Sequence, residues 1–332
     1  MKRNRMSLQD IATLAGLTKM TVSRYMRDPS KVSERSRCAI DEVMRQHNYI
    51  PNRLPEMLSG AGSKTLGVII PSFRNQIFSD VLEGIQQVAE KHGYQTIIAS
   101  DNYDPLTGQE KIITLLSYHI DGLLLTGTQH TQTARDYLKT SGIPVAELME
   151  ITSDSLDIQV GFDNRQAAFD MTGEFIRRGK KQMAFIGAMD DPRDVSRYQG
   201  MTQALQEYGL SGHHYVPGAI SSMVLGRRLF QQIIAQHPQT DAIFCTNDDL
   251  AMGVLLECQA RRIRVPEDIA IAGFHGLDIG SANQQKLASV ITPRLEAGQV
   301  ATGLLIAQLE GRRTAGSETV DLGYRLFTGD TL

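Results

Sequence analysis

The sequence of 332 residues contains no tryptophan, only three cysteines and 6% aromatic residues. It also lacks any run of the roughly 20 apolar residues that a helix needs to cross a membrane. Its first ten residues carry positive charge without an apolar segment behind them, so they do not form a secretory signal. We therefore expect a soluble, cytoplasmic protein with no membrane partner.

The cysteines are too scattered to build a metal site or a disulfide framework. Cys38, Cys245 and Cys258 have no Cys-x-x-Cys partner and no histidine at ligand spacing. Reduced thiols of this kind are usual inside cells. We expect no metal, no cofactor and no structural disulfide.

Charge is divided unevenly along the chain, although the formal net charge is only -3. Residues 1–60 contain 11 lysines and arginines against 6 acidic residues, whereas residues 61–332 contain 23 against 31. A basic end attached to an acidic body suits binding of a polyanion by that end. A merely solvated surface is the alternative explanation of the same excess.

The first fifty residues have the punctuation of a helix-turn-helix unit. Apolar residues at helical spacing predict a helix over about 7–14, with Ser7 as its N-cap. A tight turn at 15–17 follows, Thr18 can cap a second helix, and a third helix follows Ser33. In such a unit the second helix enters the major groove of DNA. An ordinary three-helix bundle with solvated polar groups is the alternative.

Side chains near the start of the second helix are the candidate DNA contacts. Arg24 can donate two hydrogen bonds to a guanine, Lys19 can donate to base edges, and Met20 offers an apolar contact to a thymine methyl group. Polar groups around them are better placed for backbone phosphates. The expected phosphate contacts are Thr18, Thr21, Ser23 and Asn48.

From residue 64 onward, short apolar runs alternate with amphipathic stretches. Buried strands are expected at about 66–70, 95–99, 122–125 and 145–148, with helices at 76–92, 107–118 and 131–141. A second series of strands is expected at about 183–187, 242–246 and 269–274. This alternation predicts an α/β body of two doubly wound parallel sheets. Ligands of such sheets bind beyond the strand ends, so a cleft between the two halves is the expected pocket.

Polar residues follow the predicted strand at 242–246. Asn247 and Asp249 can each hydrogen-bond pairs of hydroxyl groups at the rim of the cleft. Asp248 between them should point elsewhere, and we interpret it as structural, with capping of the following helix as one role. Glu147 lies inside an apolar strand and needs a partner if it is buried, but the sequence does not name that partner.

No catalytic constellation accompanies these residues. The sequence contains no G-x-G-x-x-G, P-loop or G-x-S-x-G motif. The neighbouring carboxylates of Asp248 and Asp249 should diverge rather than flank one bond. We therefore expect no catalytic residues.

Three segments resemble the lactose-repressor family of transcription regulators. They are Leu8-Gln9-Asp10-Ile11-Ala12 with Ala15-Gly16, then Thr21-Val22-Ser23-Arg24, then Asn48-Tyr49-Ile50-Pro51-Asn52-Arg53. Two later runs, 244–249 and 272–276, are similar to the gluconate and L-idonate regulators of that family. The resemblance covers essentially the whole chain, and it implies an all-α headpiece joined to a periplasmic-binding-protein-like core.

The resemblance also implies how the chain is divided. The expected parts are a headpiece at 1–48, a hinge at 49–63 and a core at 64–332, whose N-lobe spans about 64–162 and 293–321 and whose C-lobe spans about 163–291 and 322–332. When two subunits lie side by side on DNA, Asn52 to Leu58 should become a helix that inserts Leu58 into the minor groove. Pro55 lies in the first turn of that helix, where a proline is tolerated.

The resemblance also implies which residues contact the effector in the cleft. Arg197 matches the family's ligand-clamping arginine, which can bind a carboxylate or hydroxyl groups. His275 stands where sugar-sensing relatives carry an aspartate, and the loss of that negative charge favours an acidic sugar. A packing histidine is the alternative. Phe78, Phe162 and Arg294 also map near the cleft, although each could instead belong to the core or the rim.

The implied partners are a small molecule, DNA and a second subunit. The expected effector is gluconate, L-idonate or a related aldonate. A two-fold palindromic operator of double-stranded DNA demands two headpieces, so we expect a homodimer. Repression that is lifted by the effector is expected by analogy with the family alone. A sugar-binding protein, or an enzyme acting on a sugar acid, is the alternative to such a regulator.

Overall fold

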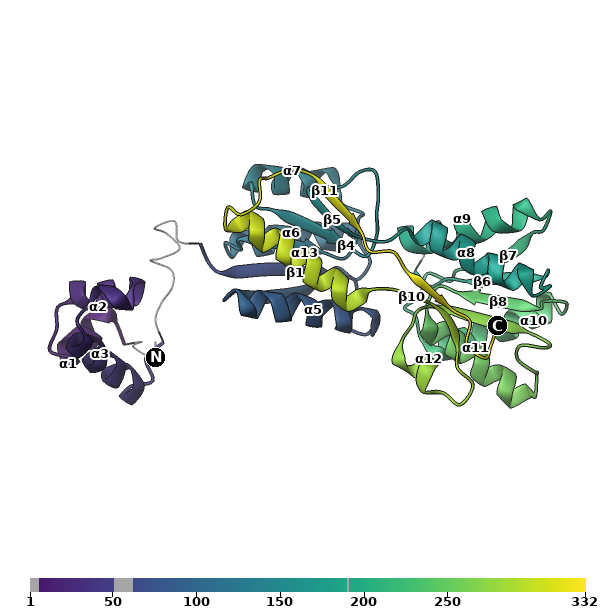
Figure 1. The fold of residues 1–332 in the computed structure, drawn as a ribbon, viewed down its shortest axis with the longest axis horizontal. Helices are drawn as coiled ribbons and strands as arrows, with labels where there is room; N and C mark the ends of the chain where they lie inside the picture. Colours follow the sequence, from purple (N-terminus) through teal and green to yellow (C-terminus); the bar gives the residue numbers. More distant parts are fainter. Residues whose placement is uncertain (1–5, 51–61, 190) are drawn as a thin grey trace. The chain divides into compact units, whose positions relative to one another are not determined.

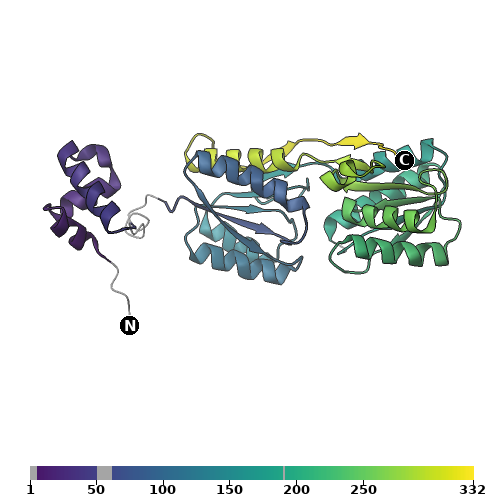
Figure 2. The same ribbon diagram turned by 90° about the horizontal axis from the view of Figure 1, so that it is seen from below.

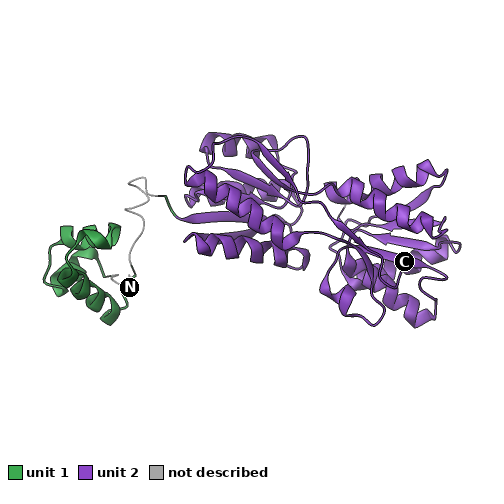
Figure 3. Ribbon diagram, in the orientation of Figure 1, with its two compact units in different colours: residues 1–63 green, residues 64–332 purple. Residues whose placement is uncertain are grey.

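The computed structural model describes residues 6–50, 62–189 and 191–332. The chain falls into two compact units, residues 1–63 and residues 64–332 (Figure 3). The predicted hinge contacts Asn52 and Leu58, and Pro55 between them, lie outside the described residues. Within the described ranges no helix is both long enough and apolar enough to cross a membrane.

Residues 6–50 of the first unit form a small helical bundle. Its elements are α1 (Leu8–Leu14), α2 (Lys19–Arg27), the short 3-10 helix η1 (Pro29–Lys31) and α3 (Glu34–Gln46). The helices bury Ile11, Ala12, Val22 and Ile40 in a common core. Because this core draws only on the first fifty residues, the unit buries its apolar faces without the rest of the chain.

The helices of this unit begin where their cap residues predict. Ser7 accepts a hydrogen bond from Asp10 N, and the Asp10 carboxylate accepts one from Ser7 N, which completes a capping box. Thr18 caps α2 by accepting from Thr21 N at 3.1 Å. Gly16 has a φ of 65°, the left-handed conformation that the tight turn requires. The predicted helix-turn-helix punctuation is confirmed at these positions.

The second unit begins with a six-stranded parallel sheet in the order β11-β5-β4-β3-β1-β2. Its strands are β1 (Thr65–Ile70), β2 (Gln95–Ser100), β3 (Gly122–Leu125), β4 (Val145–Leu148), β5 (Ile158–Gly161) and β11 (Glu318–Asp321). Its helices are α5 (Ile77–Lys91), α6 (Pro105–Ser117), α7 (Gln132–Ser141) and α13 (Arg294–Leu309). Helices α5 and α13 cover one face of the sheet, and α6 and α7 cover the other (Figure 2). We call this half the N-lobe.

A second six-stranded sheet has the order β12-β10-β9-β8-β6-β7, in which only β12 is antiparallel to its neighbour. Its strands are β6 (Met183–Ile186), β7 (Gly212–Tyr215), β8 (Ala242–Cys245), β9 (Ala270–His275), β10 (Ala288–Ile291) and β12 (Arg325–Phe327). Its helices are α8 (Asn164–Arg177), α9 (Pro192–Glu207), α10 (Met223–Gln236), α11 (Asp248–Arg261) and α12 (Asp278–Ala282). We call this half the C-lobe.

The chain passes between the two sheets three times, after β5, after β10 and after β11. These crossings return α13 and β11 to the N-lobe although both follow the C-lobe in sequence (Figure 1). The predicted architecture of a helical headpiece and two doubly wound sheets is confirmed.

The strand at Gln95–Ser100 departs from the prediction that it is buried. It is the edge strand β2, and β1 is its only partner among the described strands. Ile97 and Ile98 are 37% and 40% exposed. The predicted burial is wrong because an apolar run identifies a strand but does not reveal whether the strand has neighbours on both sides.

Helices α5 and α13 approach so closely that backbone packs against backbone. A Cβ atom on Gly84 would lie 2.1 Å from Leu295 O, and one on Gly298 would lie 2.3 Å from Val81 O. No side chain fits at such distances. Glycine at both positions therefore allows the two helices to pack as one layer of the N-lobe.

Gly84→Ala is expected to lower the free energy of unfolding by about 1–3 kcal/mol or more, because the new methyl group must push two helix backbones apart. Gly303→Ala is the matched control, since this α13 glycine has open space around its Cβ position. The control should be neutral or stabilise by about 0.5–1 kcal/mol through helix propensity. Urea denaturation followed by circular dichroism measures both variants, and equal effects would contradict the close crossing.

Candidate functional site

The first unit turns one face of α2 toward its core and the other toward solvent. Val22 is buried, whereas Lys19, Met20 and Arg24 are exposed, Met20 at 70%. These exposed side chains are the predicted base-reading residues. Met20 is a long apolar side chain that remains exposed in its own unit, which suits contact with a thymine methyl group. Their roles stay predictions.

The predicted phosphate contacts gather partly at the start of the same helix. Thr18 and Thr21 have their hydroxyl oxygens 2.9 Å apart, beside the free N–H groups of the first turn of α2. Ser23 is half-buried farther along this helix, and Asn48 is exposed just after α3. Backbone N–H groups and hydroxyls at a helix start favour an anion such as phosphate.

The second unit contains a cavity of about 380 Å³ between its two lobes. Asn75, Phe78 and Tyr103 line it from the N-lobe. Loops at the carboxyl ends of C-lobe strands and the start of α9 supply the opposite wall, as expected for parallel sheets. The C-lobe side chains are Ala188, Met189, Asp191, Arg193, Asp194, Arg197, Thr246, Asn247 and His275. We call this cavity the first hollow.

Four of the predicted effector contacts line the first hollow, namely Phe78, Arg197, Asn247 and His275. The other three do not line it. Phe162 is fully buried, and its ring centroid lies 6.2 Å from that of Phe274. Asp249 accepts a hydrogen bond from Ser221 at 2.9 Å.

Arg294 joins the two lobes instead of facing the first hollow. Its Nη2 and Nε donate to the Asp80 carboxylate at 2.6 and 2.9 Å, and Asp80 belongs to α5 of the N-lobe. Its Nη1 donates to the carbonyl oxygen of His275, which belongs to β9 of the C-lobe. Arg294 therefore touches a pocket residue only through that residue's backbone.

Arg197 lies at the centre of a buried polar network. Its Nε donates to Asn164 Oδ1 at 2.9 Å, and Nη1 donates to Thr246 O and Oγ1 at 2.6 and 3.0 Å. Its guanidinium also lies 3.8 Å from the ring centroid of Phe274. Burial lowers the pKa of Arg197 to about 10, against the opposing effect of Asp194. The guanidinium therefore stays charged at neutral pH.

His275 is neutral, and both of its ring nitrogens are occupied. Nε2 lies 3.2 Å from Arg197 Nη2, and Nδ1 lies 3.0 Å from Thr292 Oγ1. Because a guanidinium can only donate, Nε2 must accept, and the network assigns the proton to Nδ1, which donates to Thr292. Burial, followed by the charge of Arg197, holds the pKa of His275 well below its ordinary value. The ring adds no charge to the first hollow.

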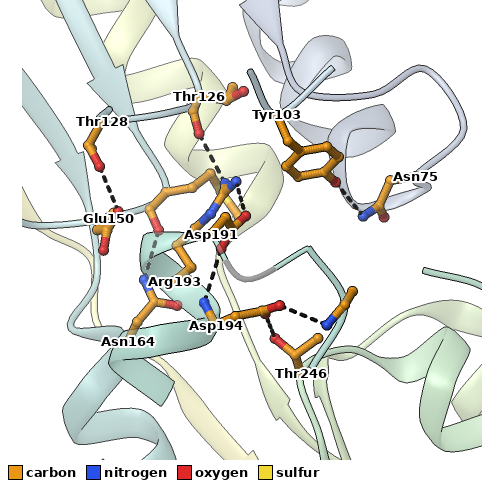
Figure 4. A network of polar contacts seen from close by, with 12 residues as sticks. Asn75, Tyr103, Thr126, Thr128, Glu150, Asn164, Asp191, Arg193, Asp194 and Thr246 are labelled. Atoms are coloured by element: carbon orange, nitrogen blue, oxygen red, sulfur yellow. Dashed lines mark hydrogen bonds and ion pairs between the residues drawn. The ribbon is translucent and has the colours of Figure 1, made fainter. Parts of the chain in front are cut away.

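Arg193 reaches across the cleft from the first turn of α9 (Figure 4). Its Nη2 donates to Asp191 Oδ2 at 2.8 Å, and its Nη1 donates to Thr126 O of the N-lobe at 3.0 Å. Burial opposes its charge, but Asp191, Tyr103 and Glu150 together outweigh burial and raise the pKa of Arg193. Burial likewise opposes the charge of Asp191, yet Arg193, the backbone N–H of Asp194 and Arg197 together hold the pKa of that carboxyl below its ordinary value.

Asp194 is connected to Arg197 through the side chain of Thr246. It accepts hydrogen bonds from Ala188 N at 2.8 Å and from Thr246 Oγ1, the same hydroxyl to which Arg197 donates. Burial, and then the charge of Asp191, raise the pKa of Asp194. The hydroxyl group of Thr246 thus bridges the carboxylate of Asp194 and the guanidinium of Arg197, and this bridge fixes the position of the guanidinium.

The run Asn247-Asp248-Asp249 divides its roles differently from the prediction. Asn247 is the N-cap of α11, since its side chain accepts from Leu250 N at 3.2 Å, so the capping role suggested for Asp248 is wrong. Asp248 instead accepts from Ser289 Oγ at 2.7 Å and from Leu277 N. Burial raises the pKa of Asp248 to about 7. Its part is structural, because it ties α11 to β10 and to the loop before α12.

The structure names the partner of Glu147. Its Oε1 lies 3.1 Å from His130 Nε2, and its Oε2 accepts from Leu156 N at 2.7 Å. Glu147 and His130 are both almost fully buried. Neither partner is close in sequence, so no local pattern could have identified them.

Sequence reasoning missed six polar residues that line the first hollow: Asn75, Tyr103, Asp191, Arg193, Asp194 and Thr246. The sequence contained a signal for one of them, Arg193. Arg193 and Arg197 are four residues apart near the start of α9, so both side chains lie on one face of that helix. Placing Arg193 in the cavity would have followed from placing Arg197 there.

A helix-turn-helix unit followed by a two-lobed α/β core is the architecture of a class of DNA-binding transcription regulators. Residues 7–52 match the profile described as bacterial regulatory proteins, lacI family. Residues 63–325 match the profile described as periplasmic binding proteins and sugar binding domain of LacI family. The chain belongs to the LacI family, as its sequence resemblance predicted, and it is a DNA-binding transcription regulator rather than an enzyme.

Known relatives are similar over their whole length. The HTH-type transcriptional regulator IdnR of Escherichia coli K12 is 49% identical, and GntR of the same strain is 44% identical, each with 100% of both chains covered. A LacI-family regulator from Silicibacter pomeroyi superposes with a TM-score of 0.93 at 29% identity, covering 98% of this chain and 99% of that one. GntR from Chromobacterium violaceum gives a TM-score of 0.76 at 32% identity, covering 80% and 98%.

Proposed function

We propose that this regulator represses genes of sugar-acid catabolism and that gluconate, L-idonate or a related aldonate controls it. It acts in the cytoplasm as a homodimer on a palindromic operator. Each subunit carries a headpiece at 1–48, a hinge at 49–63 and an effector-binding core at 64–332. Two full-length relatives named IdnR and GntR support the sugar-acid class.

The buried guanidinium of Arg197, the partly buried guanidinium of Arg193 and the neutral imidazole of His275 carry this proposal. Arg197 uses four of its five N–H groups within the protein, which leaves one without a partner among the described residues. Arg193 faces the same hollow. An aspartate in place of His275 would repel a carboxylate, whereas the neutral ring does not. The hollow therefore favours a ligand that brings one carboxylate of its own.

The same residues connect the ligand to both lobes. Arg193 belongs to the C-lobe but donates to Thr126 O of the N-lobe, and Phe78 of the N-lobe lines the same hollow. A ligand that binds these groups changes the relative stability of open and closed arrangements of the lobes. We infer that this change, passed through the hinge to a pair of headpieces, alters the affinity for the operator.

Calorimetric titration of the full-length protein with gluconate, L-idonate and glucose tests the effector class. A sugar acid should bind at least about tenfold more tightly than the neutral hexose, because only the acid offers a carboxylate to the guanidinium groups. Glucose that binds as tightly as either acid would overturn the charge argument.

His275→Asp should reverse the preference in the same titrations. The new carboxylate competes with the ligand for Arg197, so affinity for the acid should fall about tenfold or more while affinity for the neutral hexose rises. His119→Asp makes the same substitution at an exposed histidine and should change neither affinity. An unchanged preference in His275→Asp would remove this residue from the effector site.

A further inference from the structure

A second hollow of about 400 Å³ adjoins the first. The two share Tyr103, Asp191 and Arg193 in their linings, so these side chains form the boundary between them. Beyond the boundary the second hollow is lined mainly by N-lobe residues, among them Asp101, Thr128 and Glu150. Figure 4 shows Glu150 and Thr128 on the side of Arg193 away from Asp194.

The two hollows differ in electrostatic character. Apart from the Arg193–Asp191 ion pair that both share, the first contains the charged Arg197, the neutral His275 and Asp194, whose pKa burial raises and whose carboxylate already accepts hydrogen bonds from Ala188 N and Thr246 Oγ1. The second contains the carboxyl groups of Asp101 and Glu150, and burial raises the pKa of both, while Arg193 opposes this effect. A raised pKa means that each carboxylate already lacks part of its solvation, and a further negative charge nearby would be costly.

Arg193 on the boundary does not neutralise the second hollow. Its Nη2 is paired with Asp191 at 2.8 Å, and its Nη1 is held by Thr126 O. Asp191 also lines the second hollow, so the ion pair adds as much negative charge there as positive charge. The second hollow therefore keeps the excess charge of its remaining carboxylates.

The carboxylates of the second hollow can accept further hydrogen bonds. Glu150 is only 6% exposed, and its Oε2 accepts from Thr128 Oγ1 at 2.9 Å. Its Oε1 has no hydrogen-bond partner among the described residues. Asp101 accepts from Tyr103 N through Oδ1 at 3.0 Å. Ionised carboxylates accept hydrogen bonds from hydroxyl groups, whereas a carboxylate at neutral pH has no donor to offer and a phosphate monoester, with a second pKa of about 6, mostly has none.

We propose that the effector lies across both hollows, with its single carboxylate toward Arg197 and its hydroxylated end against Asp101 and Glu150, so that the protein selects an unphosphorylated sugar acid over its phosphorylated form. This inference rests on the proposed sugar-acid function and makes it more specific. It also excludes acids that carry a carboxylate at both ends, because the second one would meet the same acidic wall.

Calorimetric titration of the full-length protein with D-gluconate, 6-phospho-D-gluconate and D-glucarate tests the inference. Gluconate should bind about 100-fold more tightly than either of the others, since placing like charges together at a binding site costs several kcal/mol. Phosphogluconate or glucarate that binds as tightly as gluconate overturns the inference and leaves the sugar-acid function standing. Failure of every sugar acid to bind, gluconate and L-idonate included, removes the sugar-acid function and this inference with it.

Charge-removing variants locate the selectivity. Glu150→Gln and Asp101→Asn each delete one negative charge with little change of shape. Each should reduce the ratio of the affinities for gluconate and phosphogluconate about tenfold. Asp136→Asn makes the same kind of change on the exposed surface of α7 and should leave this affinity ratio unchanged. Thermal unfolding identifies a variant that fails to fold, in which case the other variant decides. If neither folded variant reduces the affinity ratio, the selectivity does not arise from the carboxylates of the second hollow, and the inference is overturned.

Discussion

A protein that lacks residues 1–63 is expected to lose operator binding by at least about 1,000-fold while its effector affinity stays within about twofold. The predicted DNA contacts all lie in the removed segment, which has a core of its own around Ile11, Val22 and Ile40. The first hollow is built entirely from residues of the second unit. Fluorescence anisotropy with a labelled palindromic duplex at low salt, and calorimetry with gluconate, measure the two affinities.

The full-length double variant Lys19→Ala, Arg24→Ala is the control for this truncation. Both side chains are exposed, so their removal should change the stability of the unit by no more than about 0.5 kcal/mol each. Duplex binding should nevertheless fall, because α2 would lose both of its predicted base-reading cations. Undiminished binding by the truncated protein, or indifference of the full-length chain to every palindromic duplex, would contradict a DNA-reading role for the first unit.

Local sequence signals predicted the helices and the sheet architecture well, because caps and periodicity act over a few residues. Ser7 and Thr18 mark helix starts through bonds that span three positions. The burial of β2 was wrong for the complementary reason. Strand order decides whether Ile97 faces a neighbour or solvent, and strand order depends on pairing between distant segments.

Most of the correctly predicted residues of the candidate site came from the family resemblance, whereas Asn247 was predicted from its place directly after a buried strand. Arg197 and His275 came from that resemblance, and the structure brings their side chains within 3.2 Å of each other. Arg294 maps to the same region but bonds to Asp80 and to the His275 backbone, a choice that depends on how α13 packs on α5. Asp191 precedes α9 in a loop whose course could not be predicted from local signals, whereas Arg193 could have been placed from its spacing of four residues to Arg197 on α9.

Arg197→Lys is expected to weaken effector binding by about 100-fold or more while operator binding persists and no longer responds to the effector. The planar guanidinium holds Asn164, Thr246 and His275 at once and still offers an N–H group to a ligand. An ammonium has three donors on a flexible chain and cannot hold the three partners together with a ligand. Calorimetry measures the first effect, and operator anisotropy with and without gluconate measures the second.

Two comparisons separate a binding role of Arg197 from a purely structural one. Arg165→Lys alters an exposed arginine that donates to Gln203 at 2.9 Å, and it should leave effector affinity unchanged. In a double-mutant cycle with His275→Asn, the losses should not be additive, because Arg197 Nη2 and His275 Nε2 are in direct contact at 3.2 Å. Additive losses would mean that the two side chains act independently, and the neutral imidazole would then have no part in orienting the guanidinium toward a carboxylate.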